Sequence, residues 1–340
     1  MSNFAKCFTK ASKKVNIIFS AAVILFLVSA ALSLFLGSTK LSFTDIINAI
    51  KGNVSSSGER IFIYVRLPRT LGCIVCGAAL STAGAVIQNV LNNRLASPSI
   101  IGVNSGAGLA VTICAACGIY GGWKLSMFAF LGAFSAVMFV SIFARKWGAS
   151  RGTVILMGVA INSLLNAFSD VIVTFNTDIR IISSDFKIGD FSSATYQKVI
   201  PALIVVATSL VVLFTLSNEL DVLSLGEETA KGLGLNTSLI RTLFLVLAAL
   251  LAGCAVSIAG LLSFVGLIVP HIIRRFGITQ SKHLLPLCAL IGAGFVCLCD
   301  TVARTAFAPY EIPVGIIMAF FGAPFFIFIL IKGKGGHKNA

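Results

Sequence analysis

Long apolar segments separated by short polar ones dominate the hydrophobic pattern of the chain. Each segment is about 20 residues long, which is the length an α-helix needs to cross the hydrocarbon core of a bilayer. Sustained alternation of apolar and polar residues is rare, so the pattern favours helices over a membrane β-barrel. Ten transmembrane helices are predicted, at residues 15–36, 69–90, 98–118, 124–144, 152–175, 197–217, 239–260, 262–276, 284–305 and 313–331.

Residues 217–238 form a polar segment between two of these spans. Ser224, with Glu227 three residues later, has the pattern of a capping box. Glu227 and Glu228 place negative charge in the first helical turn, where it interacts favourably with the helix dipole, and Gly232 supplies a stop. The segment therefore predicts a short helix of about two turns that is presented to water. We expect another protein to bind this helix.

The composition agrees with a membrane protein. The 340 residues are 57% hydrophobic and 11% charged, whereas soluble domains carry roughly 25% charged residues. The first apolar run, Val15–Leu36, is too long for the core of a signal peptide and is interpreted as a retained span. An all-α, polytopic membrane protein is predicted, with residues 1–340 forming one transmembrane domain.

The distribution of the net charge of +14 sets the expected orientation. With the N-terminus in the cytoplasm, sixteen of the 26 lysines and arginines fall on the cytoplasmic side, together with only four acidic residues. This asymmetry is the one that the positive-inside rule requires. It places both termini and segment 217–238 in the cytoplasm, and it accounts for the positive charge without nucleic-acid binding.

A stripe with a four-residue spacing runs along the span predicted at 152–175. It consists of Gly158 and the polar residues Asn162, Asn166 and Asp170. Amide groups in hydrocarbon are costly unless they meet partners or water. Two interpretations are open: hydrogen bonding to a neighbouring helix, and lining of a solute pathway.

A second polar pair, Asn104 and Ser105, lies in the glycine-rich segment 102–108. The spacing of Gly102 and Gly106 favours close packing between membrane helices. A polar surface on the solute pathway is the alternative interpretation of this pair.

Three arginines lie near the predicted outer ends of spans. Arg66 and Arg69 precede or begin the second span, and Arg304 is close to the end of the ninth. Anchoring to lipid headgroups is one interpretation. The other is pairing with carboxylates of a soluble partner, because guanidinium groups bind carboxylates in a bidentate manner.

No catalytic or metal-binding constellation is evident in the sequence. The GxxxxGK[ST] phosphate loop is absent, so the chain has no ATPase motif of that kind. Cys73-x-x-Cys76 lies in an apolar run, and its cysteines are interpreted as small core residues. Ion-coupled carriers usually have acidic residues deep in their spans, whereas Asp170 and Asp300 are predicted near the outer boundary. We predict no cofactor, no metal and no enzymatic activity, with an ion-coupled secondary transporter as the alternative function.

Six motifs carry a resemblance to a known family. In chain order they are RLPRTL at 66–71, LASP at 95–98, LGEETAKGLG at 225–234, FVGLIVPH at 264–271, EIPVG at 311–315 and GAPFF at 322–326. Together they make residues 15–331 similar to the permeases of ABC importers for iron-siderophores, haem and cobalamin. Arg94 departs from this family, which usually has a proline there.

The resemblance implies a type II importer permease in the bacterial cell membrane, with alternating access driven by two cytoplasmic ABC ATPase subunits. It also implies a second permease copy or a related chain, and an extracytoplasmic substrate-binding protein. An iron-siderophore is the expected cargo, with haem and cobalamin as alternatives.

The resemblance also assigns roles to residues. Binding-protein docking falls on Arg66, Arg69 and Arg304. Coupling to the ATPase falls on the segment at about 218–236, through Glu227, Glu228, Ala230, Gly232, Leu233 and Gly234. The pathway candidates are the polar residues described above, Asn104, Ser105, Asn162, Asn166 and Asp170.

Overall fold

The computed structural model describes residues 2–39, 41–52, 56–148 and 150–334, and all regular elements in these ranges are helical. They are α1 (Ser2–Phe35), α2 (Phe43–Ile50), α3 (Ser57–Ile61), η1 (Phe62–Arg66), α4 (Leu67–Val90), η2 (Pro98–Ile101), α5 (Val103–Ala116), α6 (Gly122–Lys146), α7 (Arg151–Phe175), η3 (Thr177–Ile179), α8 (Arg180–Ile188), α9 (Tyr196–Thr215), α10 (Ser217–Ser224), α11 (Glu227–Gly232), α12 (Thr237–Ala259), α13 (Val265–Arg275), α14 (Ser281–Thr305) and α15 (Val314–Lys334).

The predicted all-α, polytopic class is confirmed. Among the described residues, seven helical segments are long and apolar enough to cross a membrane; they lie in α1, α6, α7, α9, α12, α14 and the continuous stretch from α3 to α4. The other three predicted spans correspond to α5, α13 and α15. Of these three, α5 has 14 residues and α13 has 11, so both are shorter than the seven segments, whereas α15 has 21.

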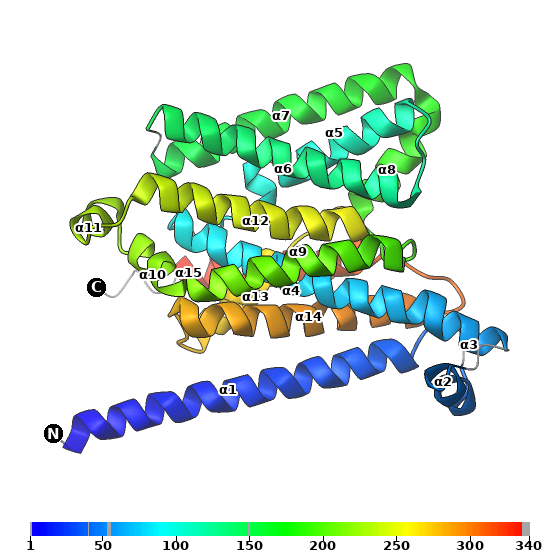
Figure 1. Cartoon of the computed structure of the whole chain (residues 1–340), viewed down its shortest axis with the longest axis horizontal. Helices are drawn as coiled ribbons and strands as arrows, with labels where there is room; N and C mark the ends of the chain where they lie inside the picture. The colour runs from blue at the N-terminus through cyan, green and yellow to red at the C-terminus, as the bar shows by residue number, and fades with distance from the viewer. Residues whose placement is uncertain (1, 40, 53–55, 149, 335–340) are drawn as a thin grey trace.

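Helix α4 is the centre of the bundle, because it packs against α12, α14, α13 and α9. Its contact surface is made of small residues such as Cys76, Ala79 and Ala83, which are fully buried. In lipid, the hydrophobic effect does not drive helices together, and van der Waals packing stabilises their contacts instead. Small side chains favour this packing because they let the helices approach closely. Helix α1 lies along α14 on one side of the bundle, and α5, α6 and α7 lie beyond α12 on the other (Figure 1).

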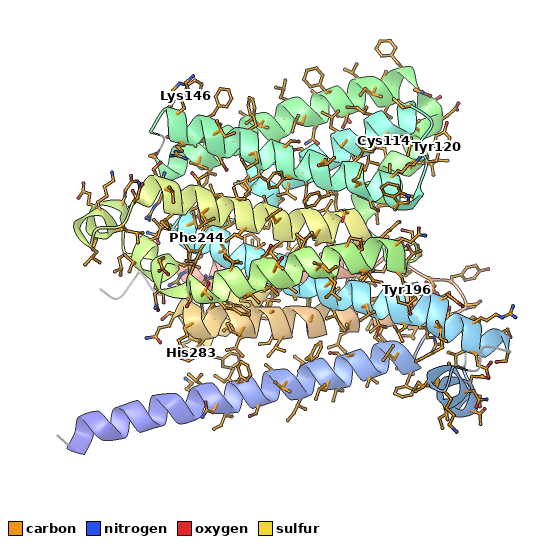
Figure 2. All side chains as sticks on the ribbon, in the orientation of Figure 1. Cys114, Tyr120, Lys146, Tyr196, Phe244 and His283 are labelled. Atoms are coloured by element: carbon orange, nitrogen blue, oxygen red, sulfur yellow. The ribbon has the colours of Figure 1, made fainter. Side chains whose placement is uncertain are left out.

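The short helices mark the two ends of the bundle (Figure 1). Helices α10 and α11 lie at the end where α1 begins, and α2, α3 and α8 lie at the opposite end. Lys146 and His283 are at the first end, whereas Tyr120 and Tyr196 are at the second (Figure 2). Residues 335–340, which are predicted to be cytoplasmic, lie outside the described residues.

The polar segment 217–238 differs from its prediction, because it contains two short helices and no capping box at Ser224. Ser224 belongs to α10, where its hydroxyl donates to the carbonyl of Asp221 at 2.6 Å. Gly226 precedes α11 with φ 125°, a conformation that is open to glycine and strained for other residues. The chain therefore turns sharply at Gly226, and α11 begins there without a serine cap.

Two breaks in the helices lie inside the bundle. Gly102 separates η2 from α5 with φ 101°, and Phe264 precedes α13 with φ 68°. The end of α12 and the backbone after it are paired with the end of α8 and the segment that follows: Leu261 N–H donates to Phe186 O at 3.0 Å, and Asp190 N–H donates to Ala259 O at 2.8 Å. Such pairing is needed because unsatisfied backbone groups are costly within a membrane.

The crossing of α4 and α13 depends on glycine at position 84. A Cβ atom there would lie 1.9 Å from the carbonyl oxygen of Gly266, whereas a Cβ atom on Gly108 in α5 would meet nothing within 4 Å. We predict that Gly84→Ala lowers the free energy of unfolding by about 1–3 kcal/mol through overpacking. Gly108→Ala should be neutral or stabilising by about 0.5–1 kcal/mol. Thermal unfolding of the detergent-purified variants checks this, and equal melting temperatures would contradict it.

Candidate transport and coupling sites

The outer arginines are buried, contrary to the exposure expected for docking or headgroup-anchoring groups. Arg69 is 4% exposed, and its guanidinium lies 2.9 Å from Asp300 Oδ1 and 2.7 Å from Glu311 Oε2. Arg304 is 3% exposed, with Nε 2.9 Å from Asp300 Oδ2 and Nη2 donating to Ser33 O at 3.0 Å. Both arginines therefore pair with the fully buried carboxylate of Asp300 inside the bundle.

Arg66 is buried for a different reason. Its guanidinium donates to the carbonyls of Leu34 at 3.1 Å and Phe35 at 2.7 Å, and also to the carbonyl of Thr39. These carbonyls lie at and just after the end of α1, where a cation suits the negative end of the helix dipole. Arg66 thus caps α1 from η1.

Asp300 and Glu311 complete an outer ion cluster that we define as Arg69, Asp300, Arg304 and Glu311. Asp300 was predicted near the outer boundary without a partner; the signal for its pairing was Arg304, four residues later on the same helix face. Burial favours the neutral form of Glu311, but hydrogen bonds from Ser38 and Arg69 outweigh it and hold the pKa of Glu311 below its usual value.

The polar stripe of α7 divides into a packed part and an exposed part. Asn162 donates to the carbonyls of Ser99 at 2.9 Å and Ile100 at 3.1 Å, and it accepts from the hydroxyl of Ser105. Asn166 and Asp170 are exposed. Asn162 and Ser105 therefore join α7 to η2 and α5, as the helix-packing interpretation predicts.

Asn104 lines a cavity of about 210 Å³ inside the bundle. The walls include Ser97 and Pro98 at the start of η2 and Ser263 and Phe264 just before α13. The cavity thus lies between the two helix breaks, where some backbone N–H and C=O groups are not paired in regular helix hydrogen bonds.

A hydrogen-bond chain begins at the polar segment and enters the bundle. The carboxylate of Asp221 in α10 accepts from the backbone N–H of Ser281 at 3.0 Å and from its hydroxyl at 2.5 Å. Ser281 is the first residue of α14, so Asp221 caps that helix from outside. Asn89, at the end of α4, donates to the same hydroxyl at 3.1 Å.

The chain continues through Arg274 of α13, which donates to Asn89 Oδ1 at 2.9 Å and also to Gln88 Oε1. Gln88 in turn donates to the carbonyl of Gly266 at 3.1 Å. Gly266 lies in the first turn of α13 and lines the cavity. We call this series the Asp221–Gly266 chain. This chain of hydrogen bonds was not predicted, because its members are distant in the sequence and join four different helices.

Helix α11 is attached to α12 by charge. Glu227 lies 2.6 Å from Arg241 and 3.1 Å from Lys231, and the hydrogen bond from Lys231, together with Arg241, lowers the pKa of Glu227. Ala230 is fully buried, whereas Leu233 is 65% exposed. Glu228, Gly232 and Gly234 are exposed as well.

The cysteines take part in packing. Cys73 and Cys76 are buried and unpaired, and the thiol of Cys76 lies 3.4 Å from the carbonyl of Ala255 in α12. Within the described ranges, no group of three His, Cys, Asp or Glu residues is placed to hold a metal ion.

The model of the FecCD transport family matches residues 24–332, which is almost the whole chain. The chain belongs to the FecCD transport family. A protein of Methanocaldococcus jannaschii described as an ABC transporter permease is 34% identical over 333 residues, covering 94% of this chain and 95% of that relative. The vitamin B12 import system permease BtuC of Yersinia pseudotuberculosis is 35% identical over 284 residues, covering 83% and 84% of the two chains.

Solved structures agree with this family. One described as an inward-facing conformation of a metal-chelate type ABC transporter aligns with a TM-score of 0.81 and 30% identity, over 94% of this chain and 99% of that one. PsaBC from Streptococcus pneumoniae aligns with a TM-score of 0.57 and 16% identity, which shows the fold alone. This FecCD permease is therefore a multi-pass transport subunit of a type II ABC importer.

The outer ion cluster should dominate the stability of this FecCD permease. Removing the charge of Asp300 leaves two buried arginines without their shared partner, and breaking a buried ion pair costs about 3–5 kcal/mol. We expect Asp300→Asn to lower the melting temperature of the purified protein strongly. Asp178→Asn, at an exposed acidic residue of the same outer region, is the matched control and should change it little. Similar melting curves for the two variants would show that the cluster is not a stabilising element.

Proposed function

We propose that the chain imports a ferric siderophore-type chelate into the bacterial cytoplasm, with energy from ATP hydrolysed by separate ABC ATPase subunits. The alignment with a metal-chelate type ABC transporter over 94% of the chain carries this proposal. Cobalamin is the alternative cargo that the BtuC relative favours, and haem is a third. The transport cycle is alternating access within a pair of permeases, either two copies of this chain or this chain and a related one.

The orientation proposed is with both termini and α10–α11 in the cytoplasm. The basic residues support it, since they gather at the end that carries α10 and α11, and α1 begins at that same end of the bundle (Figure 1). The opposite end would then meet a substrate-binding protein. Arg66, Arg69 and Arg304 lie at the end that faces the binding protein. An acidic residue of the binding protein would reach Arg69 by displacing Glu311, whose side chain is 33% exposed.

Within the coupling segment, the residues divide into two groups. Glu227 and Ala230 are occupied by contacts to the bundle and would hold α11 in place. Glu228 and Leu233, together with Leu225 and the glycines at 232 and 234, are exposed and would contact the ATPase. Movement of α11 would pass to α12 through the Glu227–Arg241 pair.

A second route would pass from α10 through the Asp221–Gly266 chain to the helix break before α13. This route ends at the cavity lined by Asn104, so it would connect the ATPase side to the solute pathway. Asn166 and Asp170 would face the pathway between the two permeases, while Asn162 and Ser105 position α7 beside η2.

The experiment that tests this function is uptake of a labelled ferric chelate into proteoliposomes. With the ATPase, the binding protein and internal ATP, we expect uptake, and without the ATPase we expect none. Uptake by the permease alone under a proton or sodium gradient would instead identify an ion-coupled secondary transporter. Uptake of labelled cobalamin or haem in place of the chelate would reassign the cargo.

The exposed surface of α11 and the residue after it, Leu233, predict a contact with the ATPase that can be tested by substitution. Leu233→Asp replaces an apolar contact whose burial is worth about 1.5–3 kcal/mol, so the affinity for the ATPase should fall by about tenfold or more. The melting temperature of the isolated permease should not change, since Leu233 is 65% exposed. Trp147→Ser, at a 66% exposed apolar residue of the same end, is the control. Normal ATPase binding by Leu233→Asp would exclude this contact.

The Asp221–Gly266 chain yields a second prediction. Arg274→Met removes charged hydrogen bonds to Gln88 and Asn89 that are worth about 1.5–3 kcal/mol each. We expect ATP-driven uptake to drop by about tenfold or more while assembly with the ATPase persists. Arg275→Met removes a neighbouring, exposed arginine and should transport normally. If both variants transport at the same rate, the Asp221–Gly266 chain has no coupling role.

A further inference from the structure

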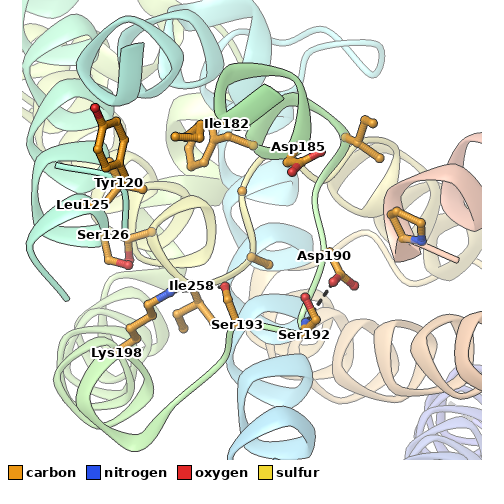
Figure 3. Close-up of a pocket in the computed structure, with 16 residues that line it drawn as sticks. Tyr120, Leu125, Ser126, Ile182, Asp185, Asp190, Ser192, Ser193, Lys198 and Ile258 are labelled. Atoms are coloured by element: carbon orange, nitrogen blue, oxygen red, sulfur yellow. Dashed lines mark hydrogen bonds between the residues drawn. The ribbon is translucent and has the colours of Figure 1, made fainter. Parts of the chain in front are cut away.

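A cavity of about 440 Å³ opens at the end of the bundle that carries α8, and Asp190 is the lining residue that lies beside Arg69 of the outer ion cluster. It lies over the end of α12, at Ser257 and Ile258, between the first turns of α6 and α9 and beside α8 (Figure 3). Helices α6 and α9 both pack on α12 and scarcely touch each other. The cavity therefore occupies the outer end of the groove between them.

One cation in this cavity has no ionic partner. Lys198, in the first turn of α9, is partly buried and donates a hydrogen bond to the hydroxyl of Ser193 at 3.2 Å. It forms no ion pair with any residue that the structure describes. Figure 3 shows Lys198 and Ser126 on the same side of the cavity, and the hydroxyl of Ser126 also has no hydrogen-bond partner in the described part of the chain. A partly desolvated ammonium beside a free hydroxyl group favours an anionic ligand group.

One carboxylate on the far side of the cavity is unpaired as well. Asp190 lies 3.8 Å from Arg69 and accepts from the backbone N–H of Ser192, so its charge is shared with the protein. Asp185 of α8 forms no ion pair among the described residues. Figure 3 places Asp185 opposite Lys198. The cavity thus offers one positive and one negative group to a ligand that carries both charges.

The surroundings of the cavity match the headgroup level of a bilayer. Tyr120 lines the cavity and is 64% exposed, and nearby Trp123 is 50% exposed. Exposed aromatic residues of this kind are typical of the membrane–water interface. Beyond the cavity, both helices expose apolar side chains that acyl chains can contact, Phe128 and Leu131 in α6 and Ile204 in α9.

We propose that this cavity binds the headgroup of an outer-leaflet aminophospholipid. The phosphate lies at Lys198, Ser126 and Ser193, and the primary ammonium lies at Asp185. The acyl chains follow the groove between α6 and α9. A bound lipid would fill the space between two helices that otherwise share few contacts, and it would brace α8 against α12.

The test is lipid binding to the delipidated, detergent-purified permease, measured by native mass spectrometry. The probes are phosphatidylethanolamine, phosphatidylglycerol and phosphatidylcholine with the same acyl chains, and soluble phosphoethanolamine. Phosphatidylethanolamine should bind at least about tenfold more tightly than the other probes, because only it combines the phosphate, a hydrogen-bonding ammonium and the acyl chains.

Lys198→Ala should weaken phosphatidylethanolamine binding by about tenfold or more, and Lys198→Arg should retain it. Lys124→Ala, at an exposed lysine in the first turn of α6, is the matched control and should have no effect. Asp185→Asn changes an exposed side chain without disturbing packing, and it should remove the preference over phosphatidylcholine. Equal binding of the three lipids, tight binding of phosphoethanolamine alone, or unchanged binding by Lys198→Ala and Asp185→Asn would each overturn the proposal.

Discussion

Asp300 carries its charge in the interior of the bundle, and the surrounding structure is arranged to keep that charge there. A buried carboxylate is tolerated only when cations and hydrogen bonds replace the water it has lost. Arg69 from α4 and Arg304 from α14 supply them, and through Ser33 and Glu311 the same arginines reach α1 and the segment before α15. The end of the permease that carries the outer ion cluster is therefore held together by interactions that are costly to separate.

The opposite end of the bundle, which carries α10 and α11, is held by a different kind of contact. The Asp221–Gly266 chain consists of hydrogen bonds and contains no ion pair. Exchanging the partner of a hydrogen bond costs less free energy than separating a buried ion pair. We infer that movements in the transport cycle change the inner contacts within each permease, while the outer ion cluster keeps α4 and α14 together. Opening at the outer end would then occur between the two permeases.

Much of the fold followed from the sequence, because span length and hydropathy are properties of local segments. The ten spans correspond to helices in the structure, and the packing role of Asn162 was one of two interpretations already stated. The burial of Arg69 was not predicted, because its partner Asp300 is distant in the sequence, and the pairing of Arg304 with Asp300 four residues earlier was missed. The prediction that Ser224 caps α11 was wrong, because Ser224 belongs to α10 and the chain turns at Gly226 before α11 begins. Contacts such as Arg274 with Gln88 depend on how helices cross, which the spacing of residues along one helix does not encode.

Hydrogen exchange of the backbone at residues 262–268 tests the central claim most directly, namely that the Asp221–Gly266 chain carries the ATPase movement into the bundle. The measurement compares the assembled transporter with and without bound ATP, for the wild-type permease and for Arg274→Met. The account predicts that ATP changes exchange in this segment of the wild type and leaves it unchanged in the variant. An equal response to ATP in both proteins would contradict it.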